Sequence, residues 1–260
     1  MAALVTAERL SFAYGGGQRT RRRPLGPLAL DRIDVAIEAG SSVGIVGGSG
    51  SGKSTLVRVL CGLLPAADGE VRFAGRDLGG WLAEDPAGFR RANQLVFQSP
   101  ASAFDPRMRI GRSLREPVKA IERRTATDAE LADWLAGVGL GPEVLARYPH
   151  QLSGGQLQRI AIARALSLHP RVLYADEPTS SLDVSVQAQV LNLLMARRDA
   201  DTSLVLVSHD LAVVAHVCEQ LIVMEDGRVV EAGSAERILA DPASEAARRL
   251  IAAADAVSLA

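Results

Sequence analysis

The sequence predicts an α/β fold with a helical subdomain inserted into its core. Short apolar segments typical of buried strands, such as Ser42–Val46 and Val172–Ala175, are each followed by helical patterns. A glycine-rich turn joins the first of these strands to a helix that begins at Ser54. Between about residues 99 and 165, strand-like runs disappear and helical periodicity takes over. This stretch is therefore predicted to be a helical insertion.

In the first part of the chain, alternation of apolar and polar residues or short apolar runs indicate strands, and the glycine-rich turn precedes the helix. The expected strands are Leu4–Phe12, Ile33–Ile37, Ser42–Val46, Glu70–Ala74 and Gln94–Phe97, and the expected helix is Ser54–Gly62. The loop from Gly15 to Pro24 contains four arginines, which could meet phosphates or acidic lipid headgroups, although a solvated loop is the simpler interpretation.

In the remainder, helical periodicity is clearest over Ile110–Arg123 and Ala129–Val138, and Gly139-Leu140-Gly141-Pro142 ends the second helix. The expected strands that follow are Val172–Ala175, Ser203–Val207, Leu221–Met224 and Arg228–Glu231, and the expected helices are Val184–Arg197 and Ser244–Ala256. Asp226-Gly227 is a turn pair that predicts a hairpin between the last two strands.

Composition limits the classes of function. Hydrophobic residues make up 48% of the 260 residues, which favours a packed interior over disorder. The net charge of −1 gives no reason to expect a nucleic-acid partner. No apolar run approaches the roughly 20 residues that span a bilayer. A role at a membrane would therefore depend on a partner protein.

A phosphate-binding loop is the first chemical motif. Residues 47–54 fit the pattern G-x-x-x-x-G-K-[ST] between a strand and a helix. Glycines allow backbone N–H groups to surround a phosphate, Lys53 supplies a positive charge to the terminal phosphates, and Ser54 offers a hydroxyl to Mg²⁺. The nucleotide-binding residues predicted here are Gly47, Gly48, Ser49, Gly50, Ser51, Gly52, Lys53, Ser54 and Thr55.

Two adjacent acids end a later apolar strand. Asp176 and Glu177 follow Val172–Ala175, about 120 residues after the phosphate loop. A carboxylate at the end of a buried strand can hold Mg²⁺, directly or through water, and Asp176 suits that role. Glu177 points elsewhere and could accept a proton from the water that attacks a γ-phosphate. An acidic pair alone would be weak evidence, but the upstream loop makes this interpretation the favoured one.

A second phosphate-binding segment lies about a hundred residues after the first. Leu152-Ser153-Gly154-Gly155-Gln156 opens a helical run, so its backbone N–H groups can meet an anion. Two separate phosphate-binding segments in one chain suggest that two copies face each other and complete each other's sites. This arrangement resembles the ATP-binding cassette (ABC) ATPases, and the resemblance covers nearly the whole chain.

The resemblance assigns roles to further residues. Tyr14 matches an aromatic residue that stacks on adenine, and Gln98 matches a glutamine that senses Mg²⁺ and the attacking water. His209 matches a histidine that contacts the γ-phosphate and orients Glu177, and Asp183 lies in a loop that connects the two sites of a dimer. Ser153 and Gly155, with Gly154 and Gln156 beside them, match groups that contact the nucleotide of the opposite protomer. Ser54, Gln98 and Asp176 form the implied metal set.

The same resemblance implies an architecture and a mechanism. It implies a P-loop NTPase cassette over 4–243, with a RecA-like core and an antiparallel β region at 4–98 and 166–243, a helical subdomain at 99–165, and a helical tail at 244–260. ATP and Mg²⁺ would be held between two ATPase subunits, identical or paralogous, and hydrolysis would open the dimer. Two transmembrane permease subunits and, indirectly, an extracytoplasmic substrate-binding protein would be partners, with this chain peripheral on the cytoplasmic face of the cell membrane.

The segment from Phe97 to Arg107 resembles the peptide and nickel importer branch. Ser99 and Asp105 depart from that branch's usual Asp and Asn, in the region where a membrane partner would dock. The chain lacks the clustered cysteines that many members carry near the C-terminus, so no iron–sulfur cluster is expected. Two alternatives are a soluble ABC protein acting on DNA or translation, and an accessory subunit of a phosphonate-degrading complex. A single cassette without long heptads or a basic face disfavours the first, and the sequence only weakly disfavours the second.

Overall fold

The computed structural model describes residues 3–15, 28–179, 182, 184–196 and 202–258. The chain divides into two compact units, Met1–Pro86 with Ser203–Ala260, and Ala87–Thr202. The predicted helical subdomain at 99–165 falls inside the second unit, while its exact boundaries and those of the ATPase domain stay predictions. In the described part of the chain, no helix is long and apolar enough to cross a membrane.

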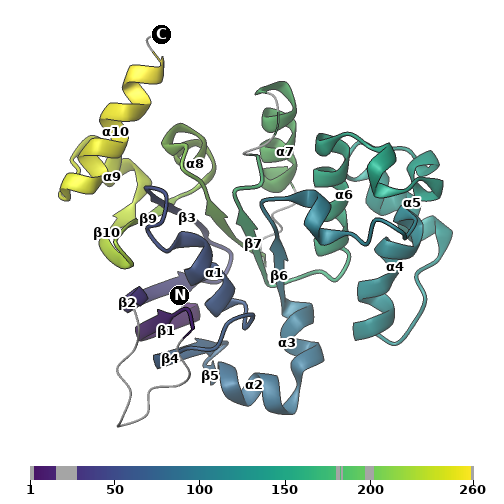
Figure 1. Cartoon of the computed structure of the whole chain (residues 1–260), viewed down its shortest axis with the longest axis horizontal. Coiled ribbons are helices and arrows are strands. Elements are labelled where there is room, and N and C mark those ends of the chain that lie inside the picture. The colour runs from purple at the N-terminus through teal and green to yellow at the C-terminus, as the bar shows by residue number, and fades with distance from the viewer. Residues whose placement is uncertain (1–2, 16–27, 180–181, 183, 197–201, 259–260) are drawn as a thin grey trace. The chain divides into compact units, whose positions relative to one another are not determined.

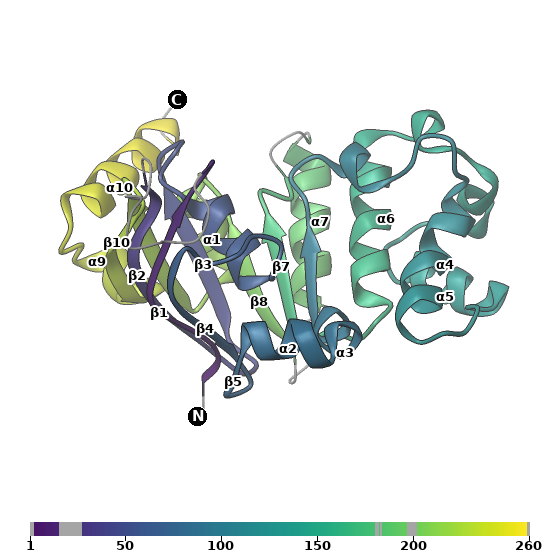
Figure 2. The same ribbon diagram turned by 60° about the horizontal axis from the view of Figure 1, so that its bottom comes forward.

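The first unit contains an antiparallel sheet with the strand order β2-β1-β4-β5, and Figure 2 shows these strands side by side. Its strands are β1 (Ala3–Ala13), β2 (Leu28–Glu38), β4 (Asp68–Phe73) and β5 (Arg76–Asp77). Alternate residues of β2 are buried over most of its length, as predicted for a strand with one face toward the core. β2 begins before the predicted Ile33, because Leu28 and Leu30 pair with Ala13 and Phe12 on β1.

A second group of strands in the first unit carries the phosphate loop. The order is β10-β9-β3-β8, with β3 parallel to β8 and β9, and β9 antiparallel to β10. The strands are β3 (Ser42–Gly47), β8 (Ser203–Val207), β9 (Gln220–Glu225) and β10 (Arg228–Ser234). Every residue of β3 is buried, so this strand forms a fixed base for the loop that follows it.

Helices complete the first unit. They are α1 (Lys53–Leu60), α2 (Leu78–Glu84), α8 (Leu211–Val217), α9 (Ala235–Ala240) and α10 (Glu245–Ser258). The predicted hairpin at Asp226-Gly227 is confirmed, since Arg228 pairs with Glu225. The C-terminal helix α10 contacts β3, β9 and α8, and Figure 1 shows it beside α9 and β10.

The second unit pairs two parallel strands with a group of helices. The strands are β6 (Asn93–Val96) and β7 (Val172–Asp176), and the helices are α3 (Pro86–Ala92), α4 (Ile110–Ile121), α5 (Asp128–Ala136), α6 (Gly154–Leu166) and α7 (Val184–Ala196), with 3₁₀ turns at Pro100–Ala103, Pro142–Ala146 and Pro149–Gln151. Leu114, Leu131 and Ile160 come from α4, α5 and α6 and share one buried apolar cluster. The helical stretch therefore contains a buried apolar cluster of its own.

Candidate functional site

The phosphate loop lies between β3 and α1 and requires glycine at several positions. Gly50 and Gly52 adopt φ values of 79° and 99°, which residues other than glycine rarely adopt. A Cβ atom on Gly52 would also lie 2.7 Å from the carbonyl oxygen of Ala29. At the other end of the loop, a Cβ atom on Gly47 would lie 2.2 Å from the carbonyl oxygen of Met224. The loop is therefore packed tightly against β2 and β9 and leads into the N-terminus of α1.

Lys53 brings a positive charge into this loop. Its side chain is nearly buried, and Nζ donates hydrogen bonds to the carbonyl oxygens of Gly47 at 2.9 Å and Gly48 at 2.8 Å. The Oγ atom of Ser51 lies 3.4 Å from the same nitrogen. Burial of an ammonium group is costly unless it is hydrogen-bonded, and these bonds reduce that cost. A bound phosphate would offer the same group a stronger, charged partner.

Tyr14 lies beside the first turn of α1. The residue is 57% exposed, and its hydroxyl is 3.0 Å from the Thr55 hydroxyl. Phe12 supports the ring edge-on, with centroids 4.9 Å apart. The predicted adenine-stacking residue is thus connected by a hydrogen bond to the helix that follows the phosphate loop. Sequence reasoning named both residues and did not anticipate this bond.

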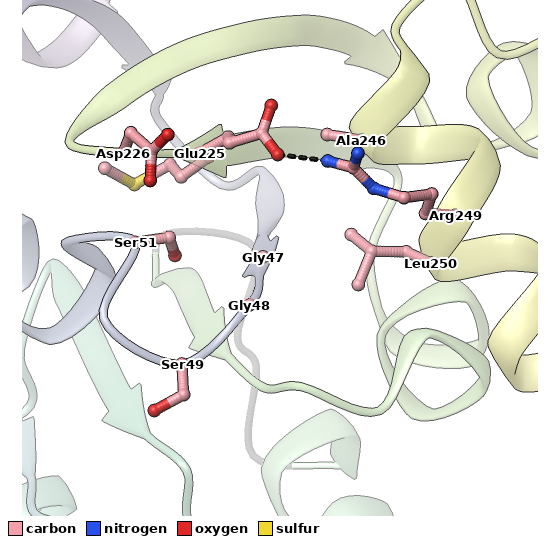
Figure 3. A pocket seen from close by; sticks show the side chains of 10 residues that line it. Gly47, Gly48, Ser49, Ser51, Glu225, Asp226, Ala246, Arg249 and Leu250 are labelled. Carbon is pink, nitrogen blue, oxygen red and sulfur yellow. Dashed lines mark hydrogen bonds and ion pairs between the residues drawn. The ribbon is translucent and has the colours of Figure 1, made fainter.

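A pocket of about 290 Å³ opens beside the loop (Figure 3). It is lined by Gly47, Gly48, Ser49 and Ser51 of the loop, by Met224, Glu225 and Asp226 of the hairpin, and by Ala246, Arg249 and Leu250 of α10. Sequence reasoning missed the contribution of the hairpin and of α10 to the surroundings of the loop. The Asp-Gly turn was visible in the sequence, but its contact with a loop 175 residues earlier has no local signal.

His209 follows β8 in the first unit and is exposed. On either side of it, the Ser208 hydroxyl accepts the Asp210 N–H at 3.0 Å, and the Asp210 carboxylate accepts the Val213 N–H at 3.2 Å. The second bond caps α8 at its N-terminus. These short-range bonds fix the backbone on both sides of the histidine.

In the second unit, parallel pairing of β6 and β7 brings together Gln98 and Glu177. Val96 is paired with Ala175, and Gln98 and Glu177 each follow two residues after a member of that pair. The Gln98 Nε2 atom donates a hydrogen bond of 3.0 Å to Glu177 Oε2. Glu177 has a φ of 46°, an uncommon conformation for a residue with a side chain. Asp176, one residue earlier, is buried. The two acids consequently lie in different environments.

The signature segment, Leu152-Ser153-Gly154-Gly155-Gln156, caps α6 at its N-terminus. The Ser153 hydroxyl accepts the Gln156 N–H at 3.2 Å, while Gln156 Oε1 accepts the Ser153 N–H at 3.0 Å. This capping box leaves the hydroxyl proton of the exposed Ser153 available to an anion. A Cβ atom on Gly155 would lie 2.6 Å from Val186 Cγ1 on α7, so glycine permits close packing of α6 on α7. Gly154 approaches Leu182, with a Cβ-to-Cδ2 distance of 4.0 Å.

The predicted site residues divide between the two units. The first unit holds Tyr14, residues 47–55 and His209, and the second holds Gln98, residues 153–156, Asp176 and Glu177. The predicted metal set is divided as well, with Ser54 in the first unit. Among the described residues, no group of three or more histidine, cysteine or acidic side chains is placed to hold a metal ion. Asp183 and the arginines at 19 and 21–23 lie outside the described residues.

Comparison with known proteins places these features in context. The sequence matches the family described as ABC transporter over residues 30–180. It is 43% identical to the oligopeptide transport ATP-binding protein OppF of Salmonella typhimurium, over 82% of this chain and 65% of OppF. It is also 43% identical to the di/tripeptide transport ATP-binding protein DppF of Pseudomonas aeruginosa, over 88% of this chain and 72% of DppF. The chain thus spans slightly less than two thirds of the length of that OppF.

Solved structures of ATP-binding cassettes have the same fold as this chain. The dimeric ATP-binding cassette MJ0796, bound to ADP and Pi after hydrolysis, superposes with a TM-score of 0.77 at 28% identity, covering 89% of this chain and 98% of MJ0796. The protein cbiO1 of Clostridium perfringens, part of the cbiONQ ABC transporter complex, gives a TM-score of 0.75 at 26% identity, covering 92% of this chain and 91% of cbiO1. Both superpositions confirm the predicted cassette fold.

Proposed function

We propose that this chain, which belongs to the ABC transporter family, binds and hydrolyses ATP to power the import of peptides across a membrane. Two structural features support the proposal. One is the glycine-rich loop with the buried Lys53, and the other is the Gln98–Glu177 hydrogen bond at the end of two parallel strands. Similarity to OppF and DppF favours peptides over nickel chelates and over the phosphonate alternative.

The phosphate loop would bind the nucleotide. A Cβ atom on Gly48 or Gly50 would meet nothing within 4 Å, so the loop is open to a phosphate there, and the N-terminus of α1 favours negative charge. Lys53 would exchange its bonds to Gly47 and Gly48 for bonds to the terminal phosphates. Tyr14, already exposed, would stack on the adenine ring.

Glu177 would act as the general base. Its carboxylate would accept a proton from a water molecule, and the Gln98 amide would orient that water while it holds the carboxylate in place. His209 would contact the γ-phosphate. Ser54, Gln98 and Asp176 would hold Mg²⁺, which stabilises negative charge on the phosphates when it is bound. The hydroxyl of Ser54 and the oxygens of the other two residues are the donor types that Mg²⁺ prefers.

The signature segment would serve a second ATPase subunit. The free Ser153 proton and the first N–H groups of α6 are suited to the γ-phosphate of a nucleotide held by that subunit. Two such subunits would close around ATP and open after hydrolysis. Permease subunits would anchor the pair at the cytoplasmic face of the membrane, and a substrate-binding protein outside would deliver the peptide.

A conservative substitution of the proposed base tests the assignment. Glu177→Gln keeps the size of the side chain and its ability to form hydrogen bonds, and removes its basicity. We therefore expect ATP binding to persist while turnover falls by about 100-fold or more. The variant should accumulate as a closed dimer with Mg-ATP, with the paralogous ATPase supplied where the pair is heteromeric. Equilibrium binding, phosphate release and size-exclusion chromatography measure these three properties.

Glu143→Gln is the matched control, because Glu143 is an exposed glutamate in the same unit. It should leave turnover unchanged. Hydrolysis by Glu177→Gln at near the parental rate would show that another group accepts the proton. A parent chain that stays monomeric with its companion and uncleaved Mg-nucleotide would contradict the shared-nucleotide model.

A further inference from the structure

The C-terminal helix α10 is fixed at its N-terminus by a buried acid. Glu231 on β10 accepts hydrogen bonds from the backbone N–H groups of Ala243 at 3.1 Å and Ser244 at 2.8 Å, directly before α10 begins. Arg237 on α9 pairs with the same carboxylate at 3.1 Å. The start of α10 is therefore attached to the β9–β10 hairpin.

One turn further along, α10 is attached to the same hairpin a second time. Ala246 and Ala247 are buried, and the helix contacts both β3 and β9. Arg249 forms ion pairs with Glu225, the last residue of β9, and with Glu245 on its own helix. Figure 3 shows the Arg249 side chain reaching from α10 to Glu225 beside the phosphate loop.

The hairpin in turn holds the phosphate loop. The Gly227 N–H donates a hydrogen bond of 3.1 Å to the Ser51 carbonyl oxygen, and the Gly227 carbonyl accepts the Asp31 N–H at 2.8 Å. At the start of the loop, Gly47 abuts the Met224 carbonyl so closely that no side chain fits between them. Residues on both sides of Glu225 thus contact the two ends of the loop.

We propose that α10 positions the phosphate loop for ATP through the β9–β10 hairpin, with Arg249 and Glu225 as positioning residues. The proposal rests on the ATP-binding function proposed above. It concerns a helix outside the region that matches the family, residues 30–180. Neither residue needs to touch the nucleotide, because their effect reaches the loop through Met224 and Gly227.

Charge reversal tests this connection more strongly than truncation does. The Arg249 and Glu225 side chains are 58% and 40% exposed, so the ion pair alone contributes little to folding. Arg249→Glu places a third carboxylate beside Glu225 and Glu245, which repels α10 from the hairpin without creating a cavity. We expect the dissociation constant for Mg-ATP to rise by about 3- to 10-fold, with kcat at saturating ATP nearly unchanged.

Two further variants complete the experiment. The double reversal Arg249→Glu with Glu225→Arg should restore parental ATP affinity, because it re-forms the ion pair in the opposite sense. Arg72→Glu is the matched control: it breaks a similarly exposed Arg72–Glu70 pair of 2.8 Å in the antiparallel sheet of the same unit. The control should bind Mg-ATP as the parent does, and the melting temperatures of all variants should stay close together.

Amide hydrogen exchange measures the connection without nucleotide. In Arg249→Glu, the Gly227 amide should exchange faster than in the parent and in Arg72→Glu, because its bond to Ser51 is loosened. Parental ATP affinity in Arg249→Glu, failure of the double reversal to restore it, or an equal loss in Arg72→Glu would each overturn the proposal. If the parent itself does not bind Mg-ATP, the proposed function fails, while an unchanged Gly227 exchange rate in Arg249→Glu would separately overturn the role of α10.

Discussion

Gln98 and Glu177 are 79 residues apart in sequence, yet one hydrogen bond of 3.0 Å joins their side chains. Glu177 is held in a left-handed backbone conformation, which costs free energy and is found mainly where a side chain must point in a particular direction. The Gln98 amide donates to the Oε2 atom of this carboxylate and so fixes the direction in which the carboxylate points. The pair is thus suited to orient a base rather than to neutralise it.

Removing the amide tests this interpretation. In Gln98→Ala the Glu177 carboxylate loses its orienting donor, so we expect kcat for ATP hydrolysis to fall by about 10- to 100-fold. The KM for ATP should change much less, because the phosphate loop and Tyr14 lie on other elements. Steady-state kinetics of phosphate release separates the two parameters. A rise in KM with unchanged kcat would show that Gln98 contributes to binding and not to the hydrolytic step.

At the scale of elements, α6 and α7 approach each other through a glycine. A Cβ atom on Gly155 would lie 2.6 Å from Val186 Cγ1, closer than real Cβ atoms come to a neighbour. We therefore expect Gly155→Ala to lower the free energy of unfolding by about 1–3 kcal/mol. Thermal or urea denaturation measures this change.

The double variant Gly155→Ala with Val186→Ala provides the control. Removing the two Val186 methyl groups makes room for the new Cβ atom, so the double variant should lose less stability than the sum of the single variants. Simple additivity of the two effects would show that the new Cβ atom does not clash with Val186. The glycine would then be explained by the backbone N–H groups it exposes to a phosphate.

The elements that the sequence predicted well are those with strong local signals. The phosphate loop, the Asp226-Gly227 hairpin and the start of a helix at Ser153 each depend on residues within a few positions of one another. Within the described ranges, four short helices were missed, namely α2, α3, α8 and α9. Among them, α2 contains Gly79 and Gly80, and α8 is capped by Asp210 but contains mainly apolar and β-branched residues. Helices of seven residues depend on tertiary packing, which a local pattern does not reveal.

The long-range contacts in the candidate site could not be predicted from the sequence for the same reason. The bonds between Gly227 and Ser51 and between Tyr14 and Thr55 join residues 176 and 41 positions apart, respectively. Each participant has an ordinary local role, in a turn, a loop or a helix. The first pair is brought together by the parallel arrangement of β3 and β9, and the second because the residue that follows β1 lies beside the first turn of α1. The C-terminal helix was likewise predicted as a helix, while its attachment beside the phosphate loop was not.

At the scale of the whole molecule, the protonation of Glu231 at low pH is expected to affect both the stability of the fold and the attachment of the C-terminal helix. Burial raises the pKa of Glu231, but the N–H donors of Ser244 and Ala243 and the Arg237 guanidinium outweigh that effect, so the pKa lies below the ordinary value of 4.5. A carboxyl group whose pKa is lowered on folding stabilises the folded state above its unfolded pKa. That stabilisation is lost as the pH falls below 4.5 and through the folded pKa.

Glu231→Gln should therefore lower the melting temperature of the protein near pH 7, since a neutral amide is a weaker acceptor for the two N–H groups and for Arg237. The melting curves of parent and variant should converge as the pH is lowered from 5 toward 3, because the parental carboxylate becomes protonated. Glu70→Gln is the control, since Glu70 forms an ion pair with Arg72 on the same strand and both side chains are exposed. A difference between parent and Glu231→Gln that stays constant over this pH range would mean that the size and shape of the side chain, and not its charge, fasten α10 to the hairpin.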